Sequence, residues 1–271
     1  MFLGKKVKNF YGVAAGLDKN AECIAGLFKM GFSLVEIGTV TPKPQSGNPK
    51  PRVFRLAKEK SILNYMGFPS KGAWEVLDNV KSYKRKENEI LGVNIGRNKD
   101  GTNQDYVDLI EMFHNVCDYI TVNVSSPNTP HLLDNLKNTQ MLEDLLELIN
   151  NFCKKKEITT PIFLKLSPDL TNLKDVYEIS CKYKIHGFIL TNTTVDKSEA
   201  PEQFRNTQMG GISGELLRGK SREMLLEFEK INTHKKPVIS AGGVNSNDEG
   251  TFRMQNGASF VQVYSGLVWW K

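Results

Sequence analysis

The sequence predicts an α/β protein of the (β/α)8, or TIM, barrel class. Three observations predict it: short apolar runs recur along the chain, helical patterns separate them, and 271 residues suffice for one such barrel. Hydrophobic residues make up 39% and charged residues 24% of the chain, as is ordinary for a globular domain. Neither a linker nor a low-complexity tract is evident, so we expect residues 1–271 to form a single domain.

Eight apolar runs have the character of parallel strands that are buried on both faces, since they are short and rich in Val, Ile and Leu. They span Gly12–Leu17, Leu34–Val40, Ile90–Ile95, Tyr119–Val124, Pro161–Leu166, Gly187–Leu190, Pro237–Ser240 and Ser259–Tyr264. An open, doubly wound sheet would show a similar alternation of strands and helices. That alternative is less favoured because no GxGxxG motif opens the first helix.

Two insertions interrupt the alternation, at residues 41–68 and 196–219. Their proline content and short polar–apolar alternation predict loops with small antiparallel strands. Both insertions follow strands, so they should lie at the carboxyl-terminal face of the barrel, where enzymes of this fold build their active sites.

The end of the chain departs from a regular barrel. Only residues 267–271 follow the eighth strand, so we expect the last helix to be missing or barely started. Without it, the side chains of Val261 and Val263 should be unusually exposed, together with Val268, Trp269 and Trp270. The segment 247–253 also has the composition of a poor helix former, because it contains Gly250.

Charge and cysteine content restrict the classes of function. The net charge is +6, but the basic groups at residues 81–86 and 154–156 lack interleaved aromatic residues, which favours solvated helix faces over a nucleic-acid site. The same field would favour an anionic ligand. The four cysteines lack CxxC spacing, so we expect small buried residues, a reducing compartment and no metal site. No apolar run approaches the ~20 residues of a membrane-spanning helix.

Polar residues and glycines cluster at the carboxyl-terminal ends of the predicted strands. A polar residue at one strand end can be explained as a helix cap. Capping does not easily explain polar residues at the ends of eight consecutive strands. The set comprises Lys19, Thr39, Asn94, Asn123, Ser126, Asn128, Lys165, Thr191, Asn192, Thr193, Gly242, Gly243, Tyr264, Ser265 and Gly266. The pattern predicts an active site at this face of the barrel.

Lys165 stands out because a cation interrupts the apolar run Ile162–Leu166. Burying an unpaired ammonium is costly, so the side chain either reaches water from the strand end or meets an anionic partner.

The glycine-rich ends of the seventh and eighth strands, with Gly214 in the preceding loop, match the place where barrels bind phosphate. Gly242-Gly243 alone would be equally compatible with a simple turn.

Amides and one hydroxyl are the candidates for substrate chemistry. Asn64, Asn123, Asn128 and Asn192 could pair with a planar substrate that has amide and imide edges, although any one of them could instead satisfy loop backbone. The four histidines fall mostly outside the strand ends. Ser126 is therefore the candidate base, provided that its proton is relayed through bound water, with Thr129 and the backbone near Phe68 as candidate supports.

Several motifs together resemble the dihydroorotate dehydrogenase family and cover nearly the whole chain in that family's order. They are AAGLDKNAE from Ala14, EIGTVTPKPQSGNPKPRVFRL from Glu36, NYMGF from Asn64, LGVNIGRNK from Leu91, NVSSPNTP from Asn123, LKLSPDL from Leu164, TNTT from Thr191, GGISG from Gly210, and AGGV and GASFVQVYSG near the end. Serine at position 126, where the other class carries cysteine, resembles the membrane-associated, quinone-linked class 2 enzymes.

The resemblance implies a flavin mononucleotide (FMN) enzyme that oxidises dihydroorotate to orotate in pyrimidine biosynthesis and passes the electrons to a quinone. It implies FMN contacts at Ala15, Gly16, Lys19, Thr39, Asn94, Asn123, Lys165, Thr191, Gly214, Gly243, Tyr264 and Ser265. It implies substrate contacts at Lys19, Asn64, Tyr65, Met66, Gly67, Phe68, Asn123, Asn128, Asn192 and Thr193, with Ser126 as the catalytic base. A reduced flavin, which is negatively charged, would be the anionic partner expected for Lys165.

The resemblance also implies a location peripheral to the bacterial cytoplasmic or the inner mitochondrial membrane. The N-terminal helical module with which class 2 members meet the membrane is expected to be absent from this chain, like the last helix. One alternative enzyme is a dihydrouridine synthase, but that FMN barrel would require a cysteine in the fourth strand loop and an RNA-binding helical domain. A non-enzymatic alternative is a gene product that keeps the motifs but does not fold.

Overall fold

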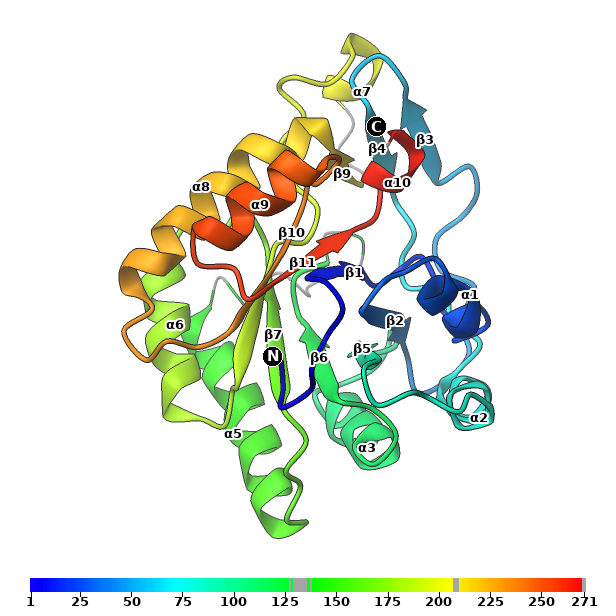
Figure 1. The fold of residues 1–271 in the computed structure, drawn as a ribbon, viewed down its shortest axis with the longest axis vertical. Coiled ribbons are helices and arrows are strands. Elements are labelled where there is room, and N and C mark those ends of the chain that lie inside the picture. Colours follow the sequence, from blue (N-terminus) through cyan, green and yellow to red (C-terminus); the bar gives the residue numbers. More distant parts are fainter. Residues whose placement is uncertain (127, 129–135, 137, 207–209, 270–271) are drawn as a thin grey trace.

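A closed barrel of eight parallel strands forms the centre of the protein (Figure 1). The computed structural model describes residues 1–126, 128, 136, 138–206 and 210–269. Around the barrel the strand order is β1 (Tyr11–Val13), β11 (Phe260–Val263), β10 (Val238–Ala241), β8 (Gly187–Leu190), β7 (Ile162–Leu166), β6 (Tyr119–Asn123), β5 (Ile90–Ile95) and β2 (Leu34–Val40). Because β1 pairs with both β2 and β11, the barrel closes, which confirms the predicted fold class and excludes an open sheet.

The strand positions agree with the apolar runs to within one or two residues except in β1. That strand ends at Val13 rather than Leu17, and Leu17 is 43% exposed. Beyond the end of β1 the Gly16 N–H donates to the Gly38 carbonyl of the neighbouring strand β2, at 2.7 Å. The residues from Ala14 to Leu17 therefore line the end of the barrel instead of extending its wall.

Helices surround the barrel. They are α1 (Ile24–Lys29), α2 (Ala73–Ser82), α3 (Gln104–Phe113), α5 (Thr139–Lys155), α6 (Leu173–Lys182), α8 (Glu215–Ile231) and α9 (Asn247–Gln255), with the short α7 (Glu202–Arg205) and α10 (Gly266–Trp269). Of these helices, α1, α2, α3, α5, α6 and α8 pack apolar faces against the outward side chains of the strands. None of the helices in the described part of the chain is long and apolar enough to cross a membrane.

Both insertions contain short antiparallel strands, as predicted, and in the structure these strands join in one small sheet. Its strands are β3 (Val53–Leu56), β4 (Ser61–Asn64) and β9 (Gly211–Gly214), in that order. In the ladder Ser61 lies opposite Gly214, so segments 150 residues apart share one sheet. Figure 1 shows this sheet with α7 and α10 at one end of the barrel. The insertions thus build a wall above the strand ends.

The barrel interior changes character along its axis. Its amino-terminal end is apolar, with Tyr119, Phe163 and Phe260 packed together and Phe2 inserted among them. Its carboxyl-terminal half is polar, because every second residue of a strand points inward and those positions hold side chains such as Lys165. The apolar layer stabilises the fold, and the polar layers form the floor of the site.

The expectation of exposed apolar side chains at the end of the chain is wrong for Val261 and Val263, which are 0% and 1% exposed. They pack with Val244 in a cluster that Phe10 and Met254 cover, so the N-terminal segment and α9 shield β11. Val268 is 45% exposed, as expected, and Trp269 is half-buried. Trp270 lies outside the described residues.

Two further expectations need correction. Residues 247–255 form the helix α9 despite their composition, because the Ser246 hydroxyl caps it by accepting from the Glu249 N–H. Cys117 and Cys153 are buried, but Cys23 is exposed and Cys181 is half-buried. Cys23 immediately precedes α1 and faces solvent, so the expectation that all four cysteines are buried is wrong for this residue.

Candidate active site

A deep pocket opens at the carboxyl-terminal end of the barrel, between the strand ends and the small sheet. Its empty volume is about 1200 Å³ when counted to its open mouth. Most of the predicted site residues line it: Ala15, Gly16, Lys19, Thr39, Asn64, Met66, Gly67, Phe68, Asn123, Ser126, Asn128, Lys165, Thr191, Asn192, Thr193, Gly214, Gly243, Tyr264 and Ser265. The pocket therefore joins residues from both insertions and from all parts of the barrel.

Two predicted residues do not line this pocket. Tyr65 is half-buried. Its backbone N–H donates to the Arg52 carbonyl at 2.7 Å, which holds Tyr65 against another part of the same insertion. Asn94 is fully buried one layer below the pocket floor. Its Oδ1 accepts from Thr39 Oγ1 at 2.6 Å and from Asn123 Nδ2 at 3.1 Å. Asn94 thus orients pocket residues from underneath.

A buried carboxylate, Glu36, fixes the orientation of Asn94. Glu36 is 0% exposed and accepts from Asn94 Nδ2, Tyr119 Oη and Gln262 Nε2, each at 2.8 Å. Because the carboxylate takes up the NH₂ group of Asn94, the carbonyl oxygen of that amide must face Thr39 and Asn123. Glu36 was not predicted as a site residue, although a carboxylate inside an apolar strand is the same signal that identified Lys165.

Four asparagines form two hydrogen-bonded pairs in the pocket wall. Asn128 Nδ2 donates to Asn64 Oδ1 at 2.9 Å, and Asn192 Nδ2 donates to Asn123 Oδ1 at 3.3 Å. Asn128 Oδ1 and Thr193 Oγ1 are buried and have no hydrogen-bond partner among the described residues. Buried polar atoms are rarely left unpaired, so these two point to a polar ligand.

Two lysines face the same cavity. Lys165 is 6% exposed, burial lowers the pKa of its ammonium, and the negative charge of Glu36 opposes that shift. No carboxylate in the described part of the chain forms an ion pair with Lys165. The anionic partner predicted for this lysine would therefore be a ligand. Burial, and then the charges of Arg52 and Lys165, lower the pKa of Lys19 to about 8. Together they give the pocket a positive potential.

Glycines form a cradle at the opposite side of the pocket. A Cβ on Gly214 would lie 2.5 Å from the Lys60 carbonyl, and one on Gly243 would lie 2.6 Å from the Arg218 Cα. Gly243 also has a φ of +75°, which favours glycine. Ser213 and Ser265 add two hydroxyls that share a hydrogen bond of 2.6 Å. Backbone amides without side chains, beside two hydroxyls, are a donor set that fits a phosphate.

Ser126 lies in the pocket wall just after β6 and is 5% exposed. Its Oγ accepts from the Asn128 N–H at 3.3 Å. No histidine or carboxylate among the described residues hydrogen-bonds this hydroxyl, so its proton would have to leave by another route. Thr129, a candidate support for that route, lies outside the described residues. The backbone at Phe68 lines the same pocket, and its carbonyl accepts from Gln45 Nε2 at 2.9 Å.

The pocket is also lined by residues that were not predicted to belong to the site. Ser213, Leu217, Ala241 and Val244 line it, and Gln262 forms part of its floor. Ser213 lies within the motif Gly-Gly-Ile-Ser-Gly, so that segment gave a signal, whereas Leu217 belongs to the first turn of α8 and its sequence position gave none.

Comparisons with known proteins show which family this chain resembles. The sequence profile described as dihydroorotate dehydrogenase matches residues 1–270. A protein of Aliivibrio fischeri named dihydroorotate dehydrogenase (quinone) is 42% identical over 280 residues, covering 98% of this chain and 82% of that protein. One of the same name from Rhodopseudomonas palustris is 44% identical over 274 residues, covering 98% and 75%.

Solved structures of similar name have the same fold. The crystal structure of ligand-free DHODH from Eimeria tenella superposes with a TM-score of 0.88 at 32% sequence identity, covering 97% of this chain and 82% of that one. The complex of the same enzyme with ferulenol gives a TM-score of 0.86 at 33% identity, covering 96% and 76%.

Proposed function

Because the chain belongs to the dihydroorotate dehydrogenase family, we propose that it oxidises dihydroorotate to orotate, with FMN as cofactor and a quinone as electron acceptor, in pyrimidine biosynthesis. The observation that carries this function is the convergence of Ser126, two pairs of asparagines and two buried lysines on one cavity with a glycine cradle at its far side. Few reactions need a base, amide recognition and an anion site in one pocket.

The proposed FMN contacts divide into three groups by chemistry. The glycine cradle and Ser265 would hold the phosphate, with Gly214 and Gly243 as the positions of close approach. Lys19 and Lys165 would supply positive charge beside the flavin ring. The remaining contacts would surround the ring with backbone and hydroxyl groups: Ala15, Gly16, Thr39, Asn94, Asn123, Thr191 and Tyr264, of which Asn94 acts from the layer beneath. When bound, the flavin supplies an acceptor for the hydride that leaves C6 of dihydroorotate.

The proposed substrate contacts orient a flat ring with amide edges. Asn64 and Asn128 approach it as one pair, and Asn123 and Asn192 as the other, because each pair is already joined by a hydrogen bond. The unpaired atoms Asn128 Oδ1 and Thr193 Oγ1 would accept and donate hydrogen bonds to its edges. Lys19 would bind the carboxylate, and the segment Asn64–Phe68 would enclose the ring.

Ser126 would act as the base. Its Oγ takes the proton from C5 while its own proton passes on through water, and the electron pair of the C5–H bond forms the C5=C6 double bond as the hydride leaves C6. Burial at 5% exposure keeps bulk water from competing for this proton. General base catalysis of this kind contributes about 10²–10⁴-fold.

Peripheral membrane association belongs to the same proposal. Quinones with long apolar tails reside in lipid, so the electron acceptor must be met at a membrane surface. Val53 lines the pocket and is 53% exposed, and Leu17 is 43% exposed. Reoxidation of the reduced protein by a short, water-soluble quinone, compared with a long-tailed quinone in vesicles, tests whether the acceptor comes from a bilayer.

The visible spectrum of the purified protein tests the function directly. We expect a bound flavin whose absorbance bleaches on anaerobic addition of dihydroorotate and returns on addition of quinone. A protein that binds no flavin, or a bound flavin that dihydroorotate leaves oxidised, would refute the proposal. Dihydrouridine in place of dihydroorotate is the control substrate and should leave the spectrum unchanged.

A further inference from the structure

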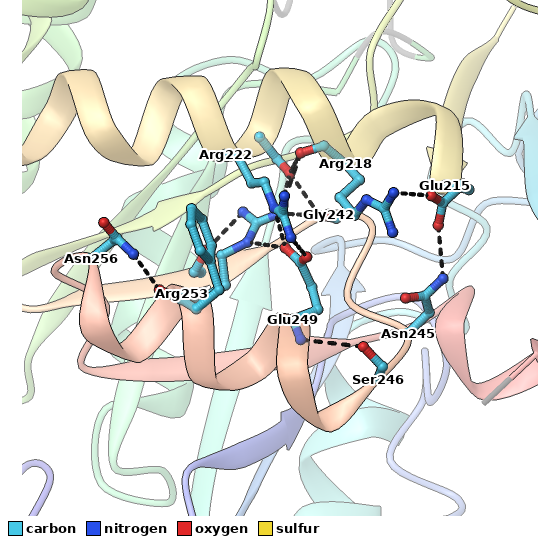
Figure 2. A network of polar contacts seen from close by, with 12 residues as sticks. Glu215, Arg218, Arg222, Gly242, Asn245, Ser246, Glu249, Arg253 and Asn256 are labelled. Carbon is cyan, nitrogen blue, oxygen red and sulfur yellow. Dashed lines mark hydrogen bonds and ion pairs between the residues drawn. The ribbon is translucent and has the colours of Figure 1, made fainter. Parts of the chain in front are cut away.

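A fully buried arginine outside the pocket lies behind the glycine cradle. Arg253 is on α9, is 0% exposed, and reaches between α8 and the end of β10 (Figure 2). Its Nε donates to Glu249 Oε1 at 2.6 Å, and its Nη1 donates to Ser240 Oγ at 3.2 Å. A buried guanidinium is costly unless its donors are satisfied, so the partners of Arg253 hold it in one defined position.

The other terminal nitrogen of Arg253, Nη2, contacts the Gly242 carbonyl, the Ser221 hydroxyl and, at 3.4 Å, the Arg218 carbonyl. Arg253 Nη2 donates to the Gly242 oxygen at 3.0 Å, and Ser221 Oγ on α8 donates to it at 2.7 Å. Arg253 Nη2 also donates to Ser221 Oγ at 2.8 Å, so the two donors hold each other in position. Neither of these side chains lines the pocket, so the Gly242 carbonyl is turned away from the ligand.

The direction of this carbonyl fixes the direction of the next amide. The C=O of Gly242 and the N–H of Gly243 belong to one peptide plane, and in a trans peptide they point in opposite directions. The Gly242 carbonyl faces Arg253, so the Gly243 N–H faces the cavity, where it has no acceptor among the described residues. Gly242 and Gly243 have φ values of +106° and +75°, so no side chain constrains this turn from within.

We propose that Arg253 is a positioning residue for the phosphate of the cofactor: it holds the Gly242 carbonyl outward and thereby presents the Gly243 N–H to the phosphate. The inference rests on the proposed function, because it assumes that a phosphate occupies the glycine cradle. Glycines restrict the orientation of the peptide between them less than other residues do, and an amide that must be reoriented binds an anion less tightly than one already in place.

Glu249 keeps the guanidinium in place. It is 2% exposed and is shared between Arg253 and Arg222, and Arg222 lies over the Phe252 ring at 4.3 Å, nearer to solvent. Arg222 contacts the same carboxylate but does not touch the Gly242 carbonyl. The two arginines therefore offer a matched comparison, one on the turn and one on the surface (Figure 2).

The test compares FMN with riboflavin, which has the same ring but no phosphate. Flavin is removed from the full chain and titrated back, and quenching of flavin fluorescence gives each dissociation constant. We expect Arg253→Met to reduce the preference for FMN over riboflavin about tenfold, which corresponds to about 1.4 kcal/mol, while riboflavin binding stays unchanged. Arg253→Lys should restore part of the preference, because an ammonium can still donate to the carbonyl.

Two further variants keep the test decisive if Arg253→Met does not fold. Ser221→Ala removes the second donor without leaving a buried charge, and should reduce the preference about threefold. Arg222→Gln should lower the melting temperature and leave the preference unchanged. An unchanged preference in both the Ser221 and Arg253 variants, with only stability lost, would overturn the positioning role. Wild-type protein that binds neither flavin would instead overturn the proposed function itself.

Discussion

Two opposite charges, Lys165 on β7 and Glu36 on β2, are buried in the polar half of the barrel without forming an ion pair. Glu36 is satisfied by three neutral donors, whereas the ammonium of Lys165 faces the pocket. An ion pair between them would have neutralised the site. Because the carboxylate is held by amides and a phenol, the positive charge stays available to a ligand.

This arrangement predicts a specific effect of removing the ammonium. Lys165→Ala should weaken FMN binding at least tenfold and slow flavin reduction by dihydroorotate, because the reduced flavin carries negative charge that the lysine would stabilise. Lys154, an exposed lysine in the last turn of α5, provides the matched control. If Lys154→Ala and Lys165→Ala retain flavin equally well, Lys165 has no ligand-binding role.

The role proposed for Ser126 predicts a change in the rate of flavin reduction and no change in FMN binding. Ser126→Ala should bind FMN normally but reduce the rate of flavin bleaching by dihydroorotate by about 10²–10⁴-fold, since only the base is removed. Anaerobic stopped-flow absorbance measures this rate without involving the quinone. A variant that bleaches within a few-fold of the wild-type rate would rule out Ser126 as the base.

Lys19 predicts how binding depends on pH. Its pKa is lowered to about 8, and an anionic ligand binds best to the ammonium form. FMN affinity should therefore be nearly constant from pH 7 to pH 8 and should fall above pH 8, by up to tenfold per unit, as the ammonium loses its proton. FMN titrations at pH 7, 8 and 9 measure this slope. Lys19→Met should bind more weakly at pH 7 and show a flatter profile; the same slope in this variant would assign the proton to another group.

Two helices with a glycine in their interior show how packing overrides helix propensity. In α9, a Cβ on Gly250 would lie 2.2 Å from the Tyr11 hydroxyl oxygen, and that hydroxyl donates to the Asn247 carbonyl at 3.3 Å. In α8, a Cβ on Gly219 would meet nothing within 4 Å. Glycine is therefore required sterically in α9, where β1 and the helix approach each other, but not in α8.

Replacing each of these two glycines by alanine should change the free energy of unfolding in opposite directions. Gly219→Ala should raise the free energy of unfolding by about 0.5–1 kcal/mol, because alanine favours the helix. Gly250→Ala should lower it by about 1–3 kcal/mol, because the added methyl group displaces Tyr11. Urea unfolding followed by circular dichroism measures both. Equal stabilisation by the two substitutions would show that Tyr11 moves aside without cost.

The whole molecule is one barrel whose mouth is built from distant parts of the chain. The pocket draws on the loop after β1, on β2, on the small sheet, and on the ends of β6, β7, β8, β10 and β11. A ligand that fills it must therefore contact most of the strands at once. Binding should be coupled to the stability of the complete barrel.

Thermal unfolding measures this coupling. At an FMN concentration of 100 times its dissociation constant the native state gains about 2.7 kcal/mol. For a domain of this size each kcal/mol raises the melting temperature by about 2–4 °C, so we expect a single transition that shifts upward by about 5–10 °C. Adenosine monophosphate, which carries a phosphate but no flavin ring, should shift it by less than about 1 °C. Two separate transitions, or none that responds to FMN, would contradict a single FMN-binding barrel.

The sequence by itself determined the barrel and most of the site. Alternation of apolar runs and helical patterns is a local property, so it located all eight barrel strands, and the polar strand ends located the pocket because parallel strands end at one face. It did not determine the burial of Val261, which depends on cover from Phe10 and Met254, far away along the chain. Nor did it reveal Glu36 and Arg253, whose partners come from other strands and helices. Only the tertiary structure decides which charge is satisfied by neutral donors and which is left facing a ligand, because that depends on distances between segments that the order of residues does not encode.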